Sequence, residues 1–512
     1  MSKPLPARPD PEQLRKQAKD LLKSHRSGNA EALRRFQEHH PDFSQATVPE
    51  LPVAAITLAD AQLVLAREHG FASWPKLMDH VESLLLETRD PLELFQQAFH
   101  ADDASLFAKL LTRYPAIRAR LNEPLGPFDS PPITHAKSRE MLDVLLAAGA
   151  DINAKSRWWA GGFGLLHNAP PELAAYAIER GAIVDVHAAA RLGMMDRLRE
   201  LVLSNPALVH SRGGDGQTPL HFASSVEVAE FLLSHGAEID ARDVDHESTP
   251  AQWMIGDRQE VARFLVRQGC RTDLLMAAAL GDLELVHKHL DADPKCILLR
   301  VDDEHFPKTN PRSGGTIYQW TLGRNASASD VARKFGHAEV LQFLLERSPA
   351  GAKLVAMLLV NDAPGVTSLL ATNPDLVKRL SPSDQRQLAH AARDNNVAAV
   401  RQMLAVGWPV DARGQHEGTA LHWAAFHGNL EMIEAILPYR PSLDLPDADH
   451  HAPPIGWATF GSEHGWYRDT GNYAGVVAAL IRAGAQLPPH ASGTPAVKAV
   501  LRQHGVKEPP RS

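Results

Sequence analysis

Hydrophobic residues along most of the chain recur every three or four positions, in short segments that end at glycine or proline. Residues 216–240 show the unit most completely, and the apolar positions of 228–233 fall on one face of a helix. Thr218 is placed to cap a short first helix, with Pro219 at its first position. Gly236 can end the second helix in the left-handed conformation. The pattern predicts two short helices and a turn, which bury their apolar faces only when copies are stacked.

The order Thr218-Pro-Leu-His-x-Ala, followed by Leu232-Leu-x-x-Gly-Ala-x-Ile-Asp, resembles an ankyrin repeat, whose period is about 33 residues. Further copies are marked by how their second helices end. Glycine endings stand at Gly149, Gly181, Gly236, Gly269, Gly407 and Gly484, and proline endings at Pro115, Pro206, Pro294 and Pro374. At the family's period, residues 90–488 hold about twelve repeats. The resemblance also implies that His167, His221 and His422 are structural histidines that bond to loop backbone.

The N-terminal residues form a different pattern. We expect 1–9 to be a disordered tail and 10–88 a helical cap domain of four helices, which would shield the first repeat. The stretch Gly70–Leu77 resembles a region found ahead of some bacterial ankyrin proteins. Residues 489–512 are predicted to be a C-terminal cap helix and tail.

Three stretches break the period, at 155–162, 301–325 and 462–472, and insertions in a solenoid map to loops that often bind partners. The sequence from Thr249 to Gly256 is echoed at 316–323 and, more weakly, at 453–461. Each copy carries a tryptophan, at Trp253, Trp320 and Trp457. These side chains either line the groove of the array or pack between neighbouring repeats.

Composition narrows the function classes. The net charge of −8 gives no overall attraction to nucleic acid or to an anionic membrane. No signal-peptide core and no apolar run of about 18 residues is present, so no membrane association is expected. With two cysteines, Cys270 and Cys296, no disulfide framework can form. These features predict a cytoplasmic protein.

The motifs of common enzymes are missing from the sequence. There is no phosphate-binding Gly-x-x-x-x-Gly-Lys loop and no Gly-x-Ser-x-Gly elbow, so we expect neither an enzyme nor a cofactor. One alternative is a metal site made by Asp449, His450, His451 and His464. With His305, these histidines would line a cleft between the 301–325 and 462–472 insertions and act as a metal-assisted hydrolase.

The sequence therefore predicts an all-α protein: a small helical cap domain followed by an ankyrin-repeat solenoid of about twelve helix–turn–helix repeats. The resemblance implies a monomeric scaffold or adaptor that binds another protein through the concave helix face and the loop tips. An inhibitor or immunity protein that occludes another molecule would show the same sequence features. The predicted contact residues are Trp158, Trp159, Asp215, Asp243, Asp245, Trp253, Trp320, Trp423, Trp457, Trp466 and Tyr467.

Overall fold

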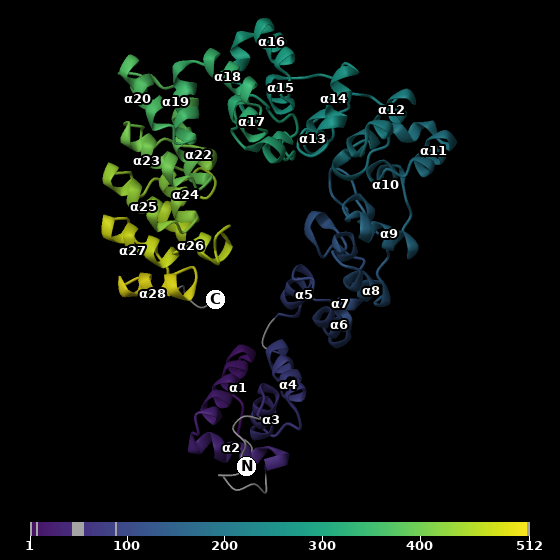
Figure 1. Cartoon of the computed structure of the whole chain (residues 1–512), viewed down its shortest axis with the longest axis vertical. Coiled ribbons are helices and arrows are strands. Elements are labelled where there is room, and N and C mark those ends of the chain that lie inside the picture. Colours follow the sequence, from purple (N-terminus) through teal and green to yellow (C-terminus); the bar gives the residue numbers. More distant parts are fainter. Residues whose placement is uncertain (1–2, 7–8, 44–55, 88–89, 509–512) are drawn as a thin grey trace. The chain divides into compact units, whose positions relative to one another are not determined.

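The computed structural model describes residues 3–6, 9–43, 56–87 and 90–508, and these consist of helices and loops (Figure 1). No strand occurs among them, and the only extended pairings are isolated bridges, Gly126–Ser130, Lys155–Gly164 and Arg300–Ser327. The prediction of an all-α fold is confirmed. The chain divides into two compact units: Met1–Leu192 with Arg212–Asp215, and Gly193–Ser211 with Gly216–Ser512.

The first unit begins with four helices that pack around two small apolar clusters. Its elements are α1 (Pro11–Arg26), α2 (Ala30–His39), η1 (Pro41–Phe43), α3 (Leu58–Glu68), α4 (Trp74–Glu87), α5 (Pro91–His100), α6 (Ala104–Arg113), α7 (Pro115–Arg118), η3 (Pro127–Asp129), η4 (Pro132–His135), α8 (Arg139–Ala147), η5 (Leu165–His167), α9 (Pro171–Glu179) and α10 (Val186–Leu192). The short turn η7 (Gly214–Gly216) spans the second of the two points where the chain passes from the first unit to the second.

The second unit consists of helix pairs joined by short turns. Its elements are α11 (Met195–Ser204), η6 (Pro206–His210), η8 (Pro219–Phe222), α12 (Val226–Ser234), α13 (Pro250–Met254), α14 (Gln259–Arg267), α15 (Leu274–Leu280), α16 (Leu283–Ala292), η9 (Pro294–Leu298), η10 (Gln319–Gly323), α17 (Ala328–Lys334), α18 (Ala338–Arg347), α19 (Ala350–Leu359), α20 (Ala363–Thr372), η11 (Val377–Arg379), α21 (Pro382–Gln385), α22 (Gln387–Arg393), α23 (Val397–Ala405), η12 (Gln415–Glu417), α24 (Ala420–Phe426), α25 (Leu430–Ile436), η13 (Leu437–Tyr439), α26 (Pro454–His464), α27 (Tyr473–Ala483) and α28 (Pro495–Gln503).

The N-terminal helices start where the sequence places helix-capping residues. Thr57 and Asp60 form a reciprocal capping box at the start of α3, with the Thr57 amide donating to the Asp60 carboxylate at 2.8 Å. Within the stretch predicted as a disordered tail, the Lys3 amide donates to the Glu68 carbonyl at 2.7 Å. Residues 1–2 and 7–8 of that stretch, and the linker 44–55, lie outside the described residues. The predicted boundary between the cap and the repeats stays a prediction.

The repeat at 216–240 has the predicted two-helix form with one correction. Its first helix, η8, is a single 3-10 turn, and Thr218 and His221 form a reciprocal capping box at its start. The Thr218 amide donates to Nδ1 of His221 at 3.1 Å, and the hydroxyl lies 2.9 Å from the same nitrogen. The second helix ends at Gly236, whose φ of +92° confirms the predicted left-handed ending.

Helices of successive repeats pack side by side and share one core. In the C-terminal part, α22, α24 and α26 contact one another in sequence, as do α23, α25 and α27. The buried side chains between these two rows form a continuous apolar cluster from Leu354 to Val506. Each repeat thus covers the apolar surface of its neighbour, as the stacking argument requires.

Two of the predicted insertions differ in form. The 301–325 stretch is closed at its base, where the Val301 amide donates to the Ala326 carbonyl, and its last residues form the π-helical turn η10. In the 462–472 stretch, α26 continues to His464 before the chain turns into α27. None of the helices described has the length and apolar character that crossing a membrane requires.

Candidate partner-binding surfaces

The turn at 243–248 fixes the loop before α13. The Asp243 carboxylate accepts the backbone amides of His246 at 2.9 Å and Ser248 at 2.6 Å, and its side chain is buried. Asp and Asn favour such turns because their side chains replace a backbone acceptor. Asp243 therefore holds the shape of the loop and does not face solvent.

The 301–325 insertion is bound to this turn along its length. The Ser313 hydroxyl and the Gly314 amide both donate to the Asp245 carbonyl, and the Ile317 amide donates to the Ser248 hydroxyl at 3.0 Å. Glu247 accepts the amide of Asn310 at 2.7 Å and that of Thr309 at 2.9 Å. The insertion is thus held against the preceding repeat by hydrogen bonds to buried backbone and to a carboxylate.

A cavity of about 480 Å³ lies between the insertion and the 242–273 segment. Its volume is within the range of small-ligand pockets. The lining includes Arg242, His246, Gln252, Arg271 and Lys308. Arginine and lysine outnumber the acidic side chains in this lining, where Glu247 and Asp273 are the only carboxylates. Both carboxylates accept hydrogen bonds from this chain.

We expect the Glu247 carboxylate to make the largest contribution to holding the 301–325 insertion in place. Burial raises its pKa, but hydrogen bonds from Thr309 and Asn310 more than offset this and lower the pKa below its usual value. Replacing Glu247 with alanine removes hydrogen bonds to a charged group, which are worth about 1.5–3 kcal/mol. We expect amide hydrogen exchange in 306–312, measured by mass spectrometry, to become about tenfold faster or more. Glu260→Ala, an exposed position on α14, should leave that exchange unchanged; equal rates in both variants would contradict the assignment.

Three rings pack where the insertion meets α13. The ring centroid of His246 lies 4.7 Å from that of Trp320 and 5.2 Å from that of Trp253. Trp320, on η10, is 58% exposed, whereas Trp253 is half-buried beneath the same histidine. We call His246, Trp253 and Trp320 the Trp320 surface.

The Trp320 surface rests on a buried polar pair. The hydroxyl of Tyr318 donates to the carboxylate of Asp273 at 2.9 Å, and the other oxygen of Asp273 caps α15 through the Met276 amide at 2.8 Å. Tyr318 has no exposed surface, and burial raises the pKa of both Tyr318 and Asp273. This pair links η10 to the preceding repeat from inside the core.

A second aromatic group lies on α24, α26 and the turn that follows α26. Trp423 is buried and lies 5.0 Å from Trp457 and 5.9 Å from Trp466, between ring centroids. The Arg393 guanidinium lies 5.4 Å from the ring centroid of Trp466, within the range of cation–π attraction. Trp466 itself is 59% exposed. The Trp466 surface, as we define it, comprises Trp466, Tyr467 and the exposed Phe460.

The turn before α26 repeats the arrangement at 243–248. The Asp447 carboxylate accepts the amides of Asp449, His450 and Ala452, and Nε1 of Trp457 donates to it at 2.7 Å. Asp447 is 2% exposed. The turns that precede the copies at 249–256 and 453–461 therefore share one design, with an aspartate at its centre.

The structural histidines behave as the resemblance implies at two of three positions. Nε2 of His221 and Nε2 of His422 donate to backbone carbonyls, those of Ser248 at 3.1 Å and Leu445 at 3.0 Å. Nε2 of His167 instead faces the carboxylate of Asp185, at 3.0 and 3.1 Å from its two oxygens.

The 155–162 insertion, in the first unit, places its tryptophans beside other rings. Trp158 lies 5.2 Å from Phe128 and 6.2 Å from Trp159, between ring centroids. Both tryptophans are half-buried, and Phe128 is 49% exposed. Asp215, also predicted as a contact, is half-buried.

The predicted contact residues thus fall into three groups. Trp320, Trp466 and Tyr467 are exposed; Trp158, Trp159, Asp215, Trp253 and Trp457 are half-buried; Asp243, Asp245 and Trp423 are buried. The last three are not retained as contacts, because Asp243 and Asp245 hold the turn and the insertion and Trp423 supports neighbouring rings. Sequence reasoning missed Phe460, an exposed ring on α26 that only the position of this helix identifies.

The residues of the alternative metal site are not gathered. In the part of the chain that the structure describes, Asp449, His450, His451 and His464 do not bring ligand atoms together as a metal-binding group. Asp449 bonds to Nδ1 of His416, and His464 packs on Phe460. His305 bonds to Asp302 at 2.7 Å. The cavities described beside 301–325 include no residue of 462–472, so these observations do not support the predicted cleft between the insertions.

Comparison with known proteins identifies the repeats. A family model of ankyrin repeats, in three copies, matches residues 186–275 and 331–447. A curated relative, the E3 ubiquitin-protein ligase XB3 of Oryza sativa subsp. japonica, is 28% identical over 92 residues, which are 18% of this chain. The match spans 20% of the length of that relative.

Proposed function

This chain contains ankyrin repeats, a protein–protein interaction module, and we propose that it is an adaptor that binds a protein partner through the Trp320 and Trp466 surfaces. Ankyrin repeats are shared by proteins with many partners, so the argument for these two surfaces comes from their own side chains. Both surfaces lie in the second unit, on the first helices of repeats or on the insertions that adjoin them.

The observation that carries the proposal is that large aromatic side chains are exposed yet held in place. Trp466 is 59% exposed and lies against Trp423, Phe426 and the Arg393 guanidinium. Tryptophan, tyrosine and arginine dominate the binding energy of protein interfaces. A ring already fixed by its neighbours loses little conformational entropy when a partner covers it.

The 155–162 insertion supports a further contact region in the first unit. Trp158, Trp159 and the exposed Phe128 pack edge to face, and Asp215 belongs to the same unit. This group fits the proposal because Trp158 and Trp159 also lie in a loop that interrupts the repeat period.

We further propose that the protein acts as a cytoplasmic monomer without enzymatic activity. Cys270 and Cys296 are free, which suits a reducing compartment where thiols stay unpaired. The ligase activity in the name of the rice relative is not carried over, since the match spans a fifth of that protein.

The proposal is tested by comparing capture of partners by variants of the full chain. Proteins retained by the wild type are identified by mass spectrometry, and their affinity is then measured for Trp320→Ala and Trp466→Ala. We expect at least one variant to lose about 2 kcal/mol of binding, roughly 30-fold in Kd. Tyr439→Ala, an exposed aromatic on η13, is the matched control and should bind like the wild type. Unchanged affinity in both tryptophan variants would show that the partner uses another surface.

A further inference from the structure

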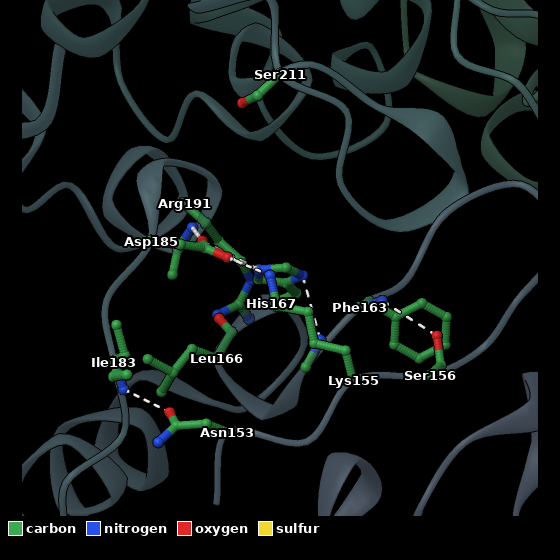
Figure 2. A network of polar contacts seen from close by, with 12 residues as sticks. Asn153, Lys155, Ser156, Phe163, Leu166, His167, Ile183, Asp185, Arg191 and Ser211 are labelled. Carbon is green, nitrogen blue, oxygen red and sulfur yellow. Dashed lines mark hydrogen bonds and ion pairs between the residues drawn. The ribbon is translucent and has the colours of Figure 1, made fainter. Parts of the chain in front are cut away.

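Three side chains of the first unit, His167, Asp185 and His187, converge where two successive repeats meet. Figure 2 shows the Asp185 carboxylate facing the His167 imidazole. His167 ends η5, and Asp185 and His187 stand at the start of α10. One ligand atom from each, imidazole nitrogen or carboxylate oxygen, lies within 4.8 Å of the other two. No other His, Cys, Asp or Glu set meets this condition in the described ranges of the chain.

The fold brings the three together from both sides of the junction. Oδ1 of Asp185 caps α10 by accepting the Ala188 amide at 2.9 Å, which fixes the carboxylate. The ring centroids of His167 and His187 are 5.8 Å apart. His187 lies directly over Gly213, where even a methyl group would stand 2.9 Å from the imidazole. The ring is therefore held in place by the backbone beneath it.

His167 differs from the equivalent histidines in what its two nitrogens contact. His221 and His422 each hold Nδ1 against a threonine, whose amide donates at 3.1 Å and whose hydroxyl lies at 2.9 Å. In this repeat the threonine is replaced by Gly164, whose amide reaches Nδ1 of His167 at only 3.4 Å. Binding of a metal to Nε2 requires the ring proton to move to Nδ1, where it would displace this long contact.

The surroundings suit a small divalent ion. Both imidazoles are about 95% buried, with exposed fractions of 4% for His167 and 5% for His187. Asp185 is open on one side to a cavity of about 180 Å³, which its lining residues Asn153 and Lys155 help to form. Two imidazoles and one carboxylate are a common ligand set for zinc, with the fourth position left for water. Bonds of about 2.0 Å place such ligand atoms roughly 3.3 Å apart, a small rotation from the observed spacing.

We propose that His167, Asp185 and His187 bind one divalent transition-metal ion of the zinc type, which joins the two repeats. The ion replaces two partners of Asp185: the proton shared with His167 and the ammonium of Lys155, whose Nζ lies 2.9 Å from Oδ2. Lys155 is thus a competitor of the metal. This site is separate from the partner-binding surfaces of the second unit.

The test is a titration of the full chain with Co²⁺ alone, followed by visible absorption, and with Zn²⁺ in competition. The wild type is expected to bind one ion with the strong visible bands of tetrahedral cobalt. His187→Gln and Asp185→Asn should weaken binding at least tenfold; the latter keeps an oxygen that can cap α10. Lys155→Met should tighten binding several-fold, since Asp185 no longer shares its charge.

The variants also separate a metal site from a purely structural contact. His221→Gln alters the equivalent histidine of another repeat and should bind cobalt like the wild type. Zn²⁺ should raise the midpoint of thermal unfolding of the wild type and of Lys155→Met, reversibly with a chelator, and not of His187→Gln. No tetrahedral spectrum up to millimolar cobalt, or equal affinity in the wild type and His187→Gln, would overturn the proposal.

Discussion

Replacing Tyr318 with alanine is expected to lower the free energy of unfolding by about 3–5 kcal/mol, the usual cost of removing a buried aromatic side chain. Tyr318 has no exposed surface and lies edge to face with Phe306, their centroids 5.4 Å apart. The variant also leaves the Asp273 carboxylate without the hydroxyl that donates to it. Urea unfolding of the full chain, followed by circular dichroism, measures the loss.

The phenylalanine variant separates the ring from the hydroxyl. Tyr318→Phe keeps the packing of the ring but removes the hydroxyl that donates to the buried Asp273 carboxylate. This loss is expected to lower the free energy of unfolding by about 1–3 kcal/mol. Combining Tyr318→Phe with Asp273→Asn, which keeps an acceptor for the Met276 amide, should recover part of that loss. If Tyr318→Phe is as stable as the wild type, the Tyr318–Asp273 bond does not stabilise this repeat. The variants also measure how firmly the Trp320 surface is supported.

The repeat architecture could be predicted because its signals are local. The left-handed ending at Gly236 and its counterpart at Gly269, φ +89°, are fixed by a conformation that glycine adopts most readily, so sequence position alone locates them. Apolar spacing of three and four residues likewise places the second helices. Such features depend on neighbours within one turn of the chain.

The surfaces were harder to predict because one residue type serves two purposes. In the sequence Asp243 looks like a solvent-exposed residue at a loop tip. In the structure its carboxylate accepts hydrogen bonds from the amides of its own turn. Trp423 and Trp466 are both tryptophans of the C-terminal repeats, yet one is buried and the other exposed. Only the packing of α24 against α26 and the turn that follows decides between them.

The pairing of His167 with Asp185 depends on a different kind of information. The two residues are 18 positions apart, and they meet because successive repeats stack. The sequence signals that could have indicated the site are the glycine in place of threonine at Gly164 and the Asp185-x-His187 spacing. Neither signal suffices alone, since each also occurs in ordinary turns and helix starts.

Acid is expected to destabilise the second unit through His422. Burial lowers the pKa of this imidazole to about 4, against 6.5 for an exposed histidine, and the nearby Arg413 acts in the same direction while Asp447 opposes it. Nδ1 accepts the Thr419 amide, so the neutral ring carries its proton on Nε2, which donates to the Leu445 carbonyl. A second proton on Nδ1 would face the Thr419 amide, which already donates to that nitrogen.

The resulting loss of stability has a defined pH window and a variant that isolates it. Above pH 6.5 the His422 ring is neutral in both the folded and the unfolded chain. Below pH 6.5 the unfolded chain binds a proton, whereas the folded chain binds it only near pH 4. A shift of this size corresponds to about 3 kcal/mol, lost progressively as the pH falls through that range. His422→Gln should be less stable at neutral pH but should lose less stability on acidification. Urea unfolding at several pH values measures both chains, and parallel pH profiles would show that His422 titrates normally.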